Sequence, residues 1–350
     1  MSQSTLSSSP YAHNNQNIRK LMLQVQVAAF PALLVHIYLF GFGIVVQWLL
    51  AVATLLVVEY TMLKLRGRPV MPFITDMSAL ITITGLVFCI PPGAPWWVIV
   101  SGSAFALIFG KHLYGGLGYN PFNPAMLGYA FLLISFPVQM TQWILPSEVA
   151  GYYIGFMDAV QLVFTGHIPS IAMDAITGAT PLNELRIGIS QGITVTETLN
   201  PMMSMNDKAA HFLFGFSSWE WINIAFLLGG LWMLYSRTIR WQFPVGFLGS
   251  LALMGFIFHT IDPNTYPPLE FVLLSGGTML AAFFIITDPV TASTTPKGRF
   301  IYACGIGVLV YVIRSWGAFP DGIAFAIILM NIAVPLIDQY TQPRVFGHKR

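Results

Sequence analysis

The chain has 350 residues, of which 55% are hydrophobic and only 9% charged, whereas a soluble domain carries about 25% charged residues. This composition predicts an integral membrane protein, and the apolar runs are continuous rather than alternating, which favours helices over a membrane β-barrel. The net charge of +2 gives no reason to expect nucleic acid as a partner. The two cysteines lie inside apolar runs, and no catalytic triad or HExxH motif occurs, so the sequence predicts neither a metal site nor catalytic residues.

Ten apolar segments meet or approach the length of about 20 residues that a membrane-spanning helix needs. They lie at roughly 21–42, 43–62, 72–90, 96–110, 124–140, 214–235, 243–260, 267–286, 300–316 and 321–340. Polar tails at 1–20 and 341–350 flank them. We therefore predict an all-α polytopic membrane protein with ten transmembrane helices.

The basic residues predict how these helices are oriented. If the amino terminus is cytoplasmic, thirteen of the sixteen Lys and Arg residues fall in tails or loops on the cytoplasmic side. Cytoplasmic loops carry such an excess of Lys and Arg. We therefore expect both termini in the cytoplasm and the long segment 141–213 on the outer, periplasmic side.

The segment 141–213 is too long for a passive connector, and it separates five spans at 21–140 from five at 214–340. Because five is odd, two equivalent halves would have opposite orientations, as in the inverted repeats of many transporters. One local likeness argues against inverted halves. VIVSGSAFALIFG (98–110) resembles VLLSGGTMLAAFF (272–284), which pairs the fourth span with the eighth, and these two spans have the same orientation.

Two segments on the cytoplasmic side, 110–128 and 287–300, are too polar and too rich in Gly and Pro to be simple turns. Backbone that leaves a helix at the membrane edge must be satisfied by protein, water or ligand. Asn120, Asn123 and Asp288 offer amide and carboxylate groups that suit a polyhydroxyl or heteroaromatic ligand. Alternatively, the two asparagines cap helices ahead of Pro121 and Pro124. Both interpretations remain open from the residues alone.

Several ionisable residues lie within or at the ends of the predicted spans, among them His36 and Glu59. Such residues are costly in lipid and are candidates for function. Most lie within a turn of a predicted interface, so we expect them to reach water. His36 is the deepest, and we expect it to be a histidine that contacts a neighbouring helix and has its polar atoms satisfied.

The stretch DAITGAT (174–180) is small and polar and ends on a hydroxyl. A match to Asp-x-x-[Ser/Thr]-Gly-Ala-Thr should arise by chance in well under about one chain in a hundred of this length. The residues alone indicate a turn with an exposed hydroxyl on a flexible stretch. A modifying enzyme could bind such a stretch easily.

Four stretches, GGLGYNPFNPAMLGYAF, DAITGAT, TDPVTASTTPKGR and WGAFPDGIAFAIILMNIAVPLID, occur in this order over nearly all of residues 15 to 342. Together they resemble the D subunits of the Rnf (Rsx) ion-translocating electron transport complex. The resemblance implies an electron transport subunit of a bacterial inner membrane translocase, which couples ferredoxin- or NAD-linked electron transfer to ion translocation and is not catalytic alone. Its implied partners are the A, B, C, E and G subunits, a periplasmic flavin transferase and membrane lipid.

In that family the transferase joins FMN through its phosphate to the last Thr of the motif. The resemblance therefore implies a covalent phosphoester between FMN and Thr180, within a motif matched by Asp174, Thr177, Gly178 and Ala179. We expect Arg186 nearby to offset the phosphate charge.

Relatives in the family also bind riboflavin non-covalently toward the cytoplasmic side. The resemblance implies a riboflavin site here with Asn120, Asn123 and Asp288 as contacts. Family members are ten-helix bundles built as inverted repeats, which favours the division into five plus five spans.

Two other functions share parts of this pattern. The B subunit of the sodium-pumping NADH:quinone reductase has the same plan, but those chains carry a longer amino-terminal region. A channel or secondary transporter for a small solute also uses inverted five-helix repeats, yet it has no reason to carry DAITGAT outside the membrane.

Overall fold

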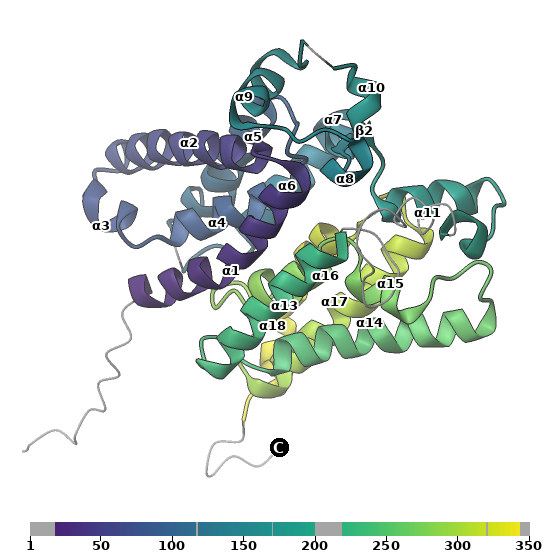
Figure 1. The fold of residues 1–350 in the computed structure, drawn as a ribbon. Coiled ribbons are helices and arrows are strands. Elements are labelled where there is room, and N and C mark those ends of the chain that lie inside the picture. The colour runs from purple at the N-terminus through teal and green to yellow at the C-terminus, as the bar shows by residue number, and fades with distance from the viewer. Residues whose placement is uncertain (1–17, 117, 170, 200–218, 320, 344–350) are drawn as a thin grey trace, which may run out of the picture.

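The structure, a computed structural model, describes residues 18–116, 118–169, 171–199, 219–319 and 321–343. Most of this part of the chain is helical (Figure 1). Five of them are long and apolar enough to cross a membrane: α1 (Ile18–Phe40), α2 (Gly43–Leu65), α14 (Gln242–Ile261), α17 (Pro296–Trp316) and α18 (Ile323–Thr341). The helical membrane class predicted from composition is thereby confirmed, with five candidate spans.

The other five predicted spans form shorter or interrupted helices. Residues 214–218, which begin one of these spans, lie outside the described residues. The helices are α3 (Val70–Ile74) and α4 (Ser78–Val87) in 72–90; α5 (Trp96–Leu107) and the π-helical turn η1 (Ile108–His112) in 96–110; α6 (Pro124–Ser135) and α7 (Pro137–Thr141) in 124–140; α13 (Trp219–Tyr235) in 214–235; and α15 (Leu269–Leu274), α16 (Thr278–Leu280) and the π-helical turn η3 (Ala281–Ile285) in 267–286. Gly276, in the left-handed region at φ 58°, separates α15 from α16. Apolar composition predicted where these segments lie but not where each helix breaks.

The helices form two groups that repeat the same order of contacts (Figure 1). In the first group α2 packs against α4 and α5, and α5 packs against α6. In the second group α14 packs against α15 and α17, and α17 packs against α18. The groups meet where α1 packs on α13 and α6 packs on α18. In this pattern the counterpart of α5 is α17. The sequence likeness instead links 98–110, which contains α5, with 272–284, which runs from α15 to η3 and has a different position in the contact order.

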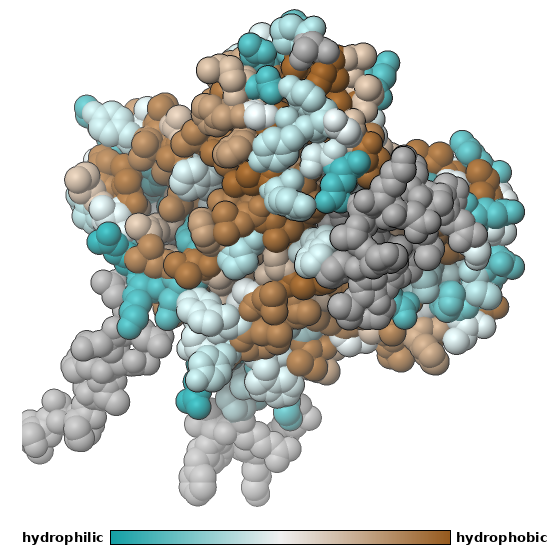
Figure 2. All heavy atoms as spheres, viewed as in Figure 1, coloured by the Kyte–Doolittle hydropathy of each residue, from teal (hydrophilic) through white to brown (hydrophobic). Residues whose placement is uncertain are grey.

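Close packing between the two groups depends on a small residue in α13. A Cβ added at Gly229 would lie 2.1 Å from the backbone oxygen of Ala28 in α1. Membrane helices use such small residues to bring their backbones together. On the face seen in Figure 2, hydrophobic residues dominate the middle of the molecule, and hydrophilic residues gather near α9–α11 and near the start of α1.

The described part of segment 141–213 divides between the two groups. Its first part contains β1 (Trp143–Ile144), α8 (Ser147–Ala150), α9 (Phe156–Thr165), α10 (Met173–Ile176) and β2 (Thr177–Gly178). There Leu162 shares a buried cluster with Phe40 and Val46 of the first group. By contrast α11 (Pro181–Ser190) shares a cluster with the second group, through Leu185 and Phe271. The chain passes from one group to the other at residues 179–180.

Candidate functional site

The DAITGAT stretch is an ordered element that ends on a helix cap. Its Thr177 and Gly178 form β2, which pairs antiparallel with β1, so that Gly178 lies opposite Trp143. A Cβ on Gly178 would lie 2.7 Å from Leu145 Cδ2, so the Leu145 side chain packs directly over the glycine. The Thr177 hydroxyl donates to the Met173 carbonyl at 2.9 Å. Residues 177–178 thus form a short paired strand where the residues alone indicated a turn.

Thr180 caps the amino terminus of α11. Its Oγ1 accepts a hydrogen bond from the Asn183 backbone N–H at 3.3 Å, and Pro181 occupies the first helical position. Threonine followed by proline is a typical helix start. The side chain is half-buried rather than exposed, and it faces into a cavity.

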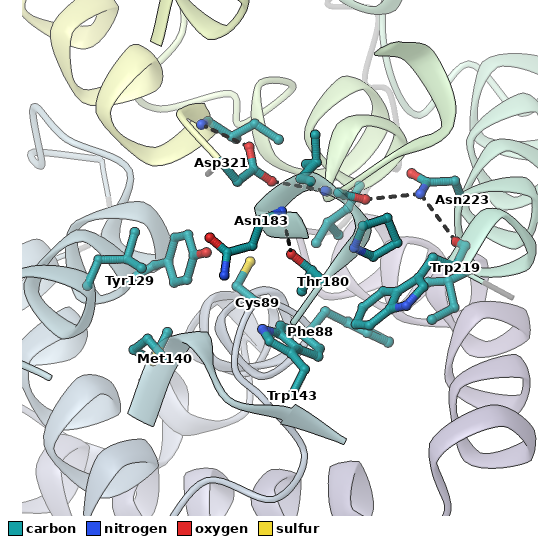
Figure 3. Close-up of a pocket in the computed structure, with 18 of the residues that line it drawn as sticks. Phe88, Cys89, Tyr129, Met140, Trp143, Thr180, Asn183, Trp219, Asn223 and Asp321 are labelled. Carbon is teal, nitrogen blue, oxygen red and sulfur yellow. Dashed lines mark hydrogen bonds between the residues drawn. The ribbon is translucent and has the colours of Figure 1, made fainter. Parts of the chain in front are cut away.

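The cavity that Thr180 lines, here called the threonine cavity, has a volume of about 110 Å³. Its lining comes from both helix groups and from α11 (Figure 3). Five of its lining residues are aromatic: Phe88, Tyr129, Trp143, Trp219 and Phe226. The rings of Trp143 and Trp219 meet edge to face, with centroids 4.9 Å apart. The Thr180 hydroxyl thus opens onto a space suited to a planar heteroaromatic ligand.

Polar groups of the threonine cavity also hold the break between α15 and α16. The Asn223 amide donates to the carbonyls of Leu274 at 2.7 Å and Gly276 at 3.0 Å, and its oxygen accepts from Met279 N–H at 3.1 Å. Asp321 accepts from Gly277 N–H at 3.1 Å. These two side chains satisfy backbone groups that would otherwise be unpaired where the helix is interrupted.

The other motif residues have different surroundings. Asp174 is exposed on α10 and Ala179 is half-buried, and neither lines the threonine cavity. Arg186, expected beside the Thr180 phosphate, lines a separate cavity of about 360 Å³ together with Tyr266 and Arg314. Of the matched motif residues, only Thr180 reaches the threonine cavity.

Asn120, Asn123 and Asp288 line one cavity of about 220 Å³, here called the asparagine cavity. Asn123 caps α6, because its Oδ1 accepts from Met126 N–H at 3.2 Å. Asn120 is no cap: its amide donates to the Phe122 carbonyl at 3.1 Å. Its buried Oδ1 has no hydrogen-bond partner within the described residues. The cap interpretation is thus right for Asn123, and Asn120 keeps a free acceptor.

Asp288 holds the segment that follows η3. Its two oxygens accept from Val290 N–H at 3.1 Å and from the Thr291 hydroxyl at 2.9 Å. The asparagine cavity therefore joins the two polar segments, 110–128 and 287–300, that the sequence singled out separately.

The two cavities lie back to back. Phe88, Leu280 and Ile285 line both of them. Phe88 follows α4, whereas the other two belong to α16 and η3, so each helix group contributes to the shared wall.

Sequence reasoning missed several polar residues of these cavities. Lys111 lines the asparagine cavity and pairs with Glu59, which is 0% exposed, so the expectation that Glu59 reaches water is wrong. Asn183 and Asn223 line the threonine cavity without any motif to mark them. A charge inside an apolar run is the one signal that marked Glu59. Within the described residues, no group of three or more His, Cys, Asp or Glu could hold a metal ion.

The expected contact of His36 with a neighbouring helix is present. Its ring lies 6.4 Å from that of Phe88, and both residues line the threonine cavity. Its Nδ1 has no hydrogen-bond partner in the part of the chain that the structure describes.

The chain is similar to known proteins over nearly its whole length. A model of the NQR2, RnfD, RnfE family matches residues 5–347. The chain is 47% identical, over 353 aligned positions and 99% of each protein, to the D subunit of the ion-translocating oxidoreductase complex of Shigella dysenteriae serotype 1 (strain Sd197). It is likewise 47% identical, over 99% of each protein, to the D subunit of the same complex of Escherichia coli O81 (strain ED1a). The chain belongs to the NQR2, RnfD, RnfE family.

Proposed function

We propose that this chain is the flavin-carrying membrane subunit of an Rnf-type complex, which couples ferredoxin- or NAD-linked electron transfer to ion translocation across the bacterial inner membrane. Membership of the family and the name of its relatives support the role of a subunit in an ion-translocating oxidoreductase. The observation that carries the proposal is the Thr180 hydroxyl, which ends the DAITGAT motif and faces an aromatic cavity.

Thr180 is the attachment point for FMN in this proposal. A phosphoester on its Oγ1 would lie at the amino terminus of α11, where the helix dipole favours negative charge. Trp143 and Trp219 provide aromatic surface for the isoalloxazine, and the unpaired Nδ1 of His36 provides a polar contact. A periplasmic flavin transferase would make the bond before the complex works. The bound flavin supplies the redox chemistry, and the chain positions it.

The asparagine cavity is the proposed site of non-covalent riboflavin. Riboflavin has no phosphate, and the polar groups of this cavity are mainly amides and hydroxyls, which suits an uncharged polyhydroxyl ligand. The free Oδ1 of Asn120 is a buried acceptor that lacks a partner among the described residues, and a flavin N–H could satisfy it. Asn123 and Asp288 would hold the two polar segments around the ligand.

The proposed architecture has ten spans in two inverted halves, with both termini in the cytoplasm and 141–213 in the periplasm. The repeated order of helix contacts supports equivalent halves. Thirteen of the sixteen Lys and Arg residues lie on the side assigned to the cytoplasm, which supports the orientation. Interrupted helices such as α15–α16 are typical of inverted-repeat transporters, where they surround a binding site.

The proposed partners are the A, B, C, E and G subunits of the complex and membrane lipid. A B-type subunit of the sodium-pumping NADH:quinone reductase belongs to the same family, but the relatives at 47% identity are named as D subunits of an ion-translocating oxidoreductase complex. A small-solute channel would not need the covalent flavin.

The covalent flavin can be tested by denaturing gel electrophoresis under ultraviolet light, together with intact mass. Wild-type protein produced with the transferase should fluoresce and carry one added flavin phosphate. Thr180→Val should lose both signals, whereas Thr165→Val, an exposed threonine of the same segment, should keep them. Wild type without the adduct, or Thr180→Val with it, would refute the proposal.

A further inference from the structure

A buried ion pair forms part of the wall of the asparagine cavity. Lys111 Nζ lies 2.7 Å from Glu59 Oε1 and 3.3 Å from the Ser78 hydroxyl. Lys111 is 3% and Glu59 0% exposed. His112 Nε2 approaches the same carboxylate oxygen at 3.2 Å. The pair is thus held by α2, by the start of α4 and by η1, all in the first helix group.

Only one member of this pair faces the cavity. Lys111 and Ser78 line it, whereas Glu59 does not, so the carboxylate lies behind the ammonium group. Lys111 and Asp288 are the only charged side chains among its described lining residues. Asp288 is engaged by Val290 and Thr291. Lys111 is therefore the positive charge that the described lining presents to an occupant of the cavity, alongside the hydrogen-bonded carboxylate of Asp288.

The second helix group also holds an ion pair beside a hydroxyl. Arg314 of α17 donates to the Thr278 hydroxyl at 3.1 Å and pairs with Asp321 at 3.1 Å. Thr278 begins α16 as Ser78 begins α4. There the carboxylate of Asp321, and not Arg314, lines the threonine cavity. The asparagine cavity thus receives the basic member of one ion pair and the threonine cavity the acidic member of another. The two carboxylates occupy different places in the contact order, because Glu59 lies in α2 and Asp321 precedes α18.

Stability alone is a poor explanation for such a pair. Removing two charges from water costs several kcal/mol per ion, and apolar side chains of similar volume often stabilise a protein as well or better. A cation on a cavity wall acts on the charge of its ligand, and this interaction is strong where the effective dielectric constant is low.

We propose that Lys111 is a positioning residue that raises the redox potential of the non-covalent flavin in the asparagine cavity, with Glu59 as the counter-ion that limits this effect. The inference rests on the proposed function, which places riboflavin there. A neutral flavin that takes up two electrons and one proton gains one negative charge, and a neighbouring cation stabilises that reduced form. In the complex the electrons come from the redox groups of partner subunits; in the test they come from dithionite.

The test is a spectroscopic redox titration of the purified full chain in a Thr180→Val background, so that only non-covalent flavin is titrated. Glu59→Gln leaves Lys111 unopposed and should raise the potential. Lys111→Met leaves the Glu59 carboxylate without its cation and should lower the flavin redox potential by at least about 30 mV. This shift corresponds to a tenfold change in the two-electron equilibrium constant. The double variant, Lys111→Met with Glu59→Gln, should lie between wild type and Lys111→Met. It removes both charges of the pair together, so it carries the test if Lys111→Met does not fold.

Lys64→Met is the matched control, because Lys64 is an exposed cation in the last turn of α2. Its flavin should titrate as wild type does. The riboflavin dissociation constant, from fluorescence quenching, gives a second readout for each variant. Equal potentials in all variants with bound flavin would overturn the role of Lys111 and leave the riboflavin site intact. If neither the Thr180→Val protein nor any variant made in it carries non-covalent flavin, the proposed riboflavin site is overturned, and the inference with it.

Discussion

Asn331 of α18 fixes the start of α6: its Oδ1 accepts a hydrogen bond from the Asn123 backbone N–H at 3.1 Å, across 208 residues of sequence. Its amide donates to the Thr291 carbonyl at 3.1 Å and to the Tyr302 hydroxyl at 2.9 Å. One side chain, 3% exposed, thereby joins both helix groups beside the asparagine cavity.

Asn331→Leu should lower the melting temperature in detergent. The substitution leaves the Asn123 N–H and the Thr291 carbonyl without this partner, and a buried unsatisfied group costs about 1–3 kcal/mol. Gln339→Leu, at an exposed position of the same helix, is the control. Equal melting temperatures for the two variants would show that Asn331 does not hold the groups together.

Gly229→Ala should weaken the contact between α1 and α13. The new Cβ would lie 2.1 Å from the Ala28 backbone oxygen, so the helices must separate, and overpacking of this kind costs about 1–3 kcal/mol. At Gly249 nothing lies within 4 Å of an added Cβ. Gly249→Ala should therefore be neutral or stabilising, since alanine is favoured over glycine in helices by about 1 kcal/mol. Thermal unfolding of the two variants measures the contrast, and a Gly229→Ala protein as stable as wild type would contradict it.

Two glutamates of segment 141–213 should give stability opposite dependences on pH. Burial raises the pKa of Glu184, so the folded chain binds this proton more readily than the unfolded chain. The stabilisation that Glu184 contributes is present at low pH. It falls as the pH rises from the ordinary pKa of a glutamate through the raised pKa of Glu184 in the folded chain. Glu184→Gln should flatten that slope when melting is followed from about pH 4 to about pH 7.

Glu197 should act in the opposite sense. The backbone N–H and the hydroxyl of Thr194 hold the pKa of Glu197 below its ordinary value. The stabilisation that Glu197 contributes is present when the pH is above the ordinary pKa of a glutamate. It is lost as the pH falls through the lowered pKa of Glu197 in the folded chain. Glu197→Gln should therefore reduce stability at neutral pH more than at acid pH. The same sign of effect in both variants would show that these local contacts do not set the pH dependence.

The proposed orientation predicts which positions react with an impermeant thiol reagent in whole cells. Ser190→Cys, exposed on α11, should be labelled from outside. Thr75→Cys, exposed between α3 and α4, should react only after the cells are opened. The chain without either substitution shows the background from Cys89 and Cys304. The reverse pattern would invert the topology.

Local signals predicted much of this molecule. The apolar runs marked the long helices, and Asn123-Pro124 was one of two possible helix starts that the sequence left open. Thr180-Pro181 carries the same signal, but the sequence analysis did not predict a helix there. The interruption at residues 275–277 was hidden, because Ser-Gly-Gly inside an apolar run also suits close helix packing. Lys111 and Glu59 could be seen only separately, since 52 residues divide them. The distance of a residue from a helix end predicts whether its side chain reaches water. Its burial also depends on which neighbouring helix covers that side of the helix, and a single sequence does not show this.

The wall formed by Phe88, Leu280 and Ile285 has two faces, each of which bounds a different cavity. Each of these three side chains therefore supplies surface to both cavities at once. A substitution at Phe88 changes the shape of the space beside Thr180 and of the space beside Asn120 in a single step, so the two proposed flavin sites share one wall and cannot be reshaped independently at this position.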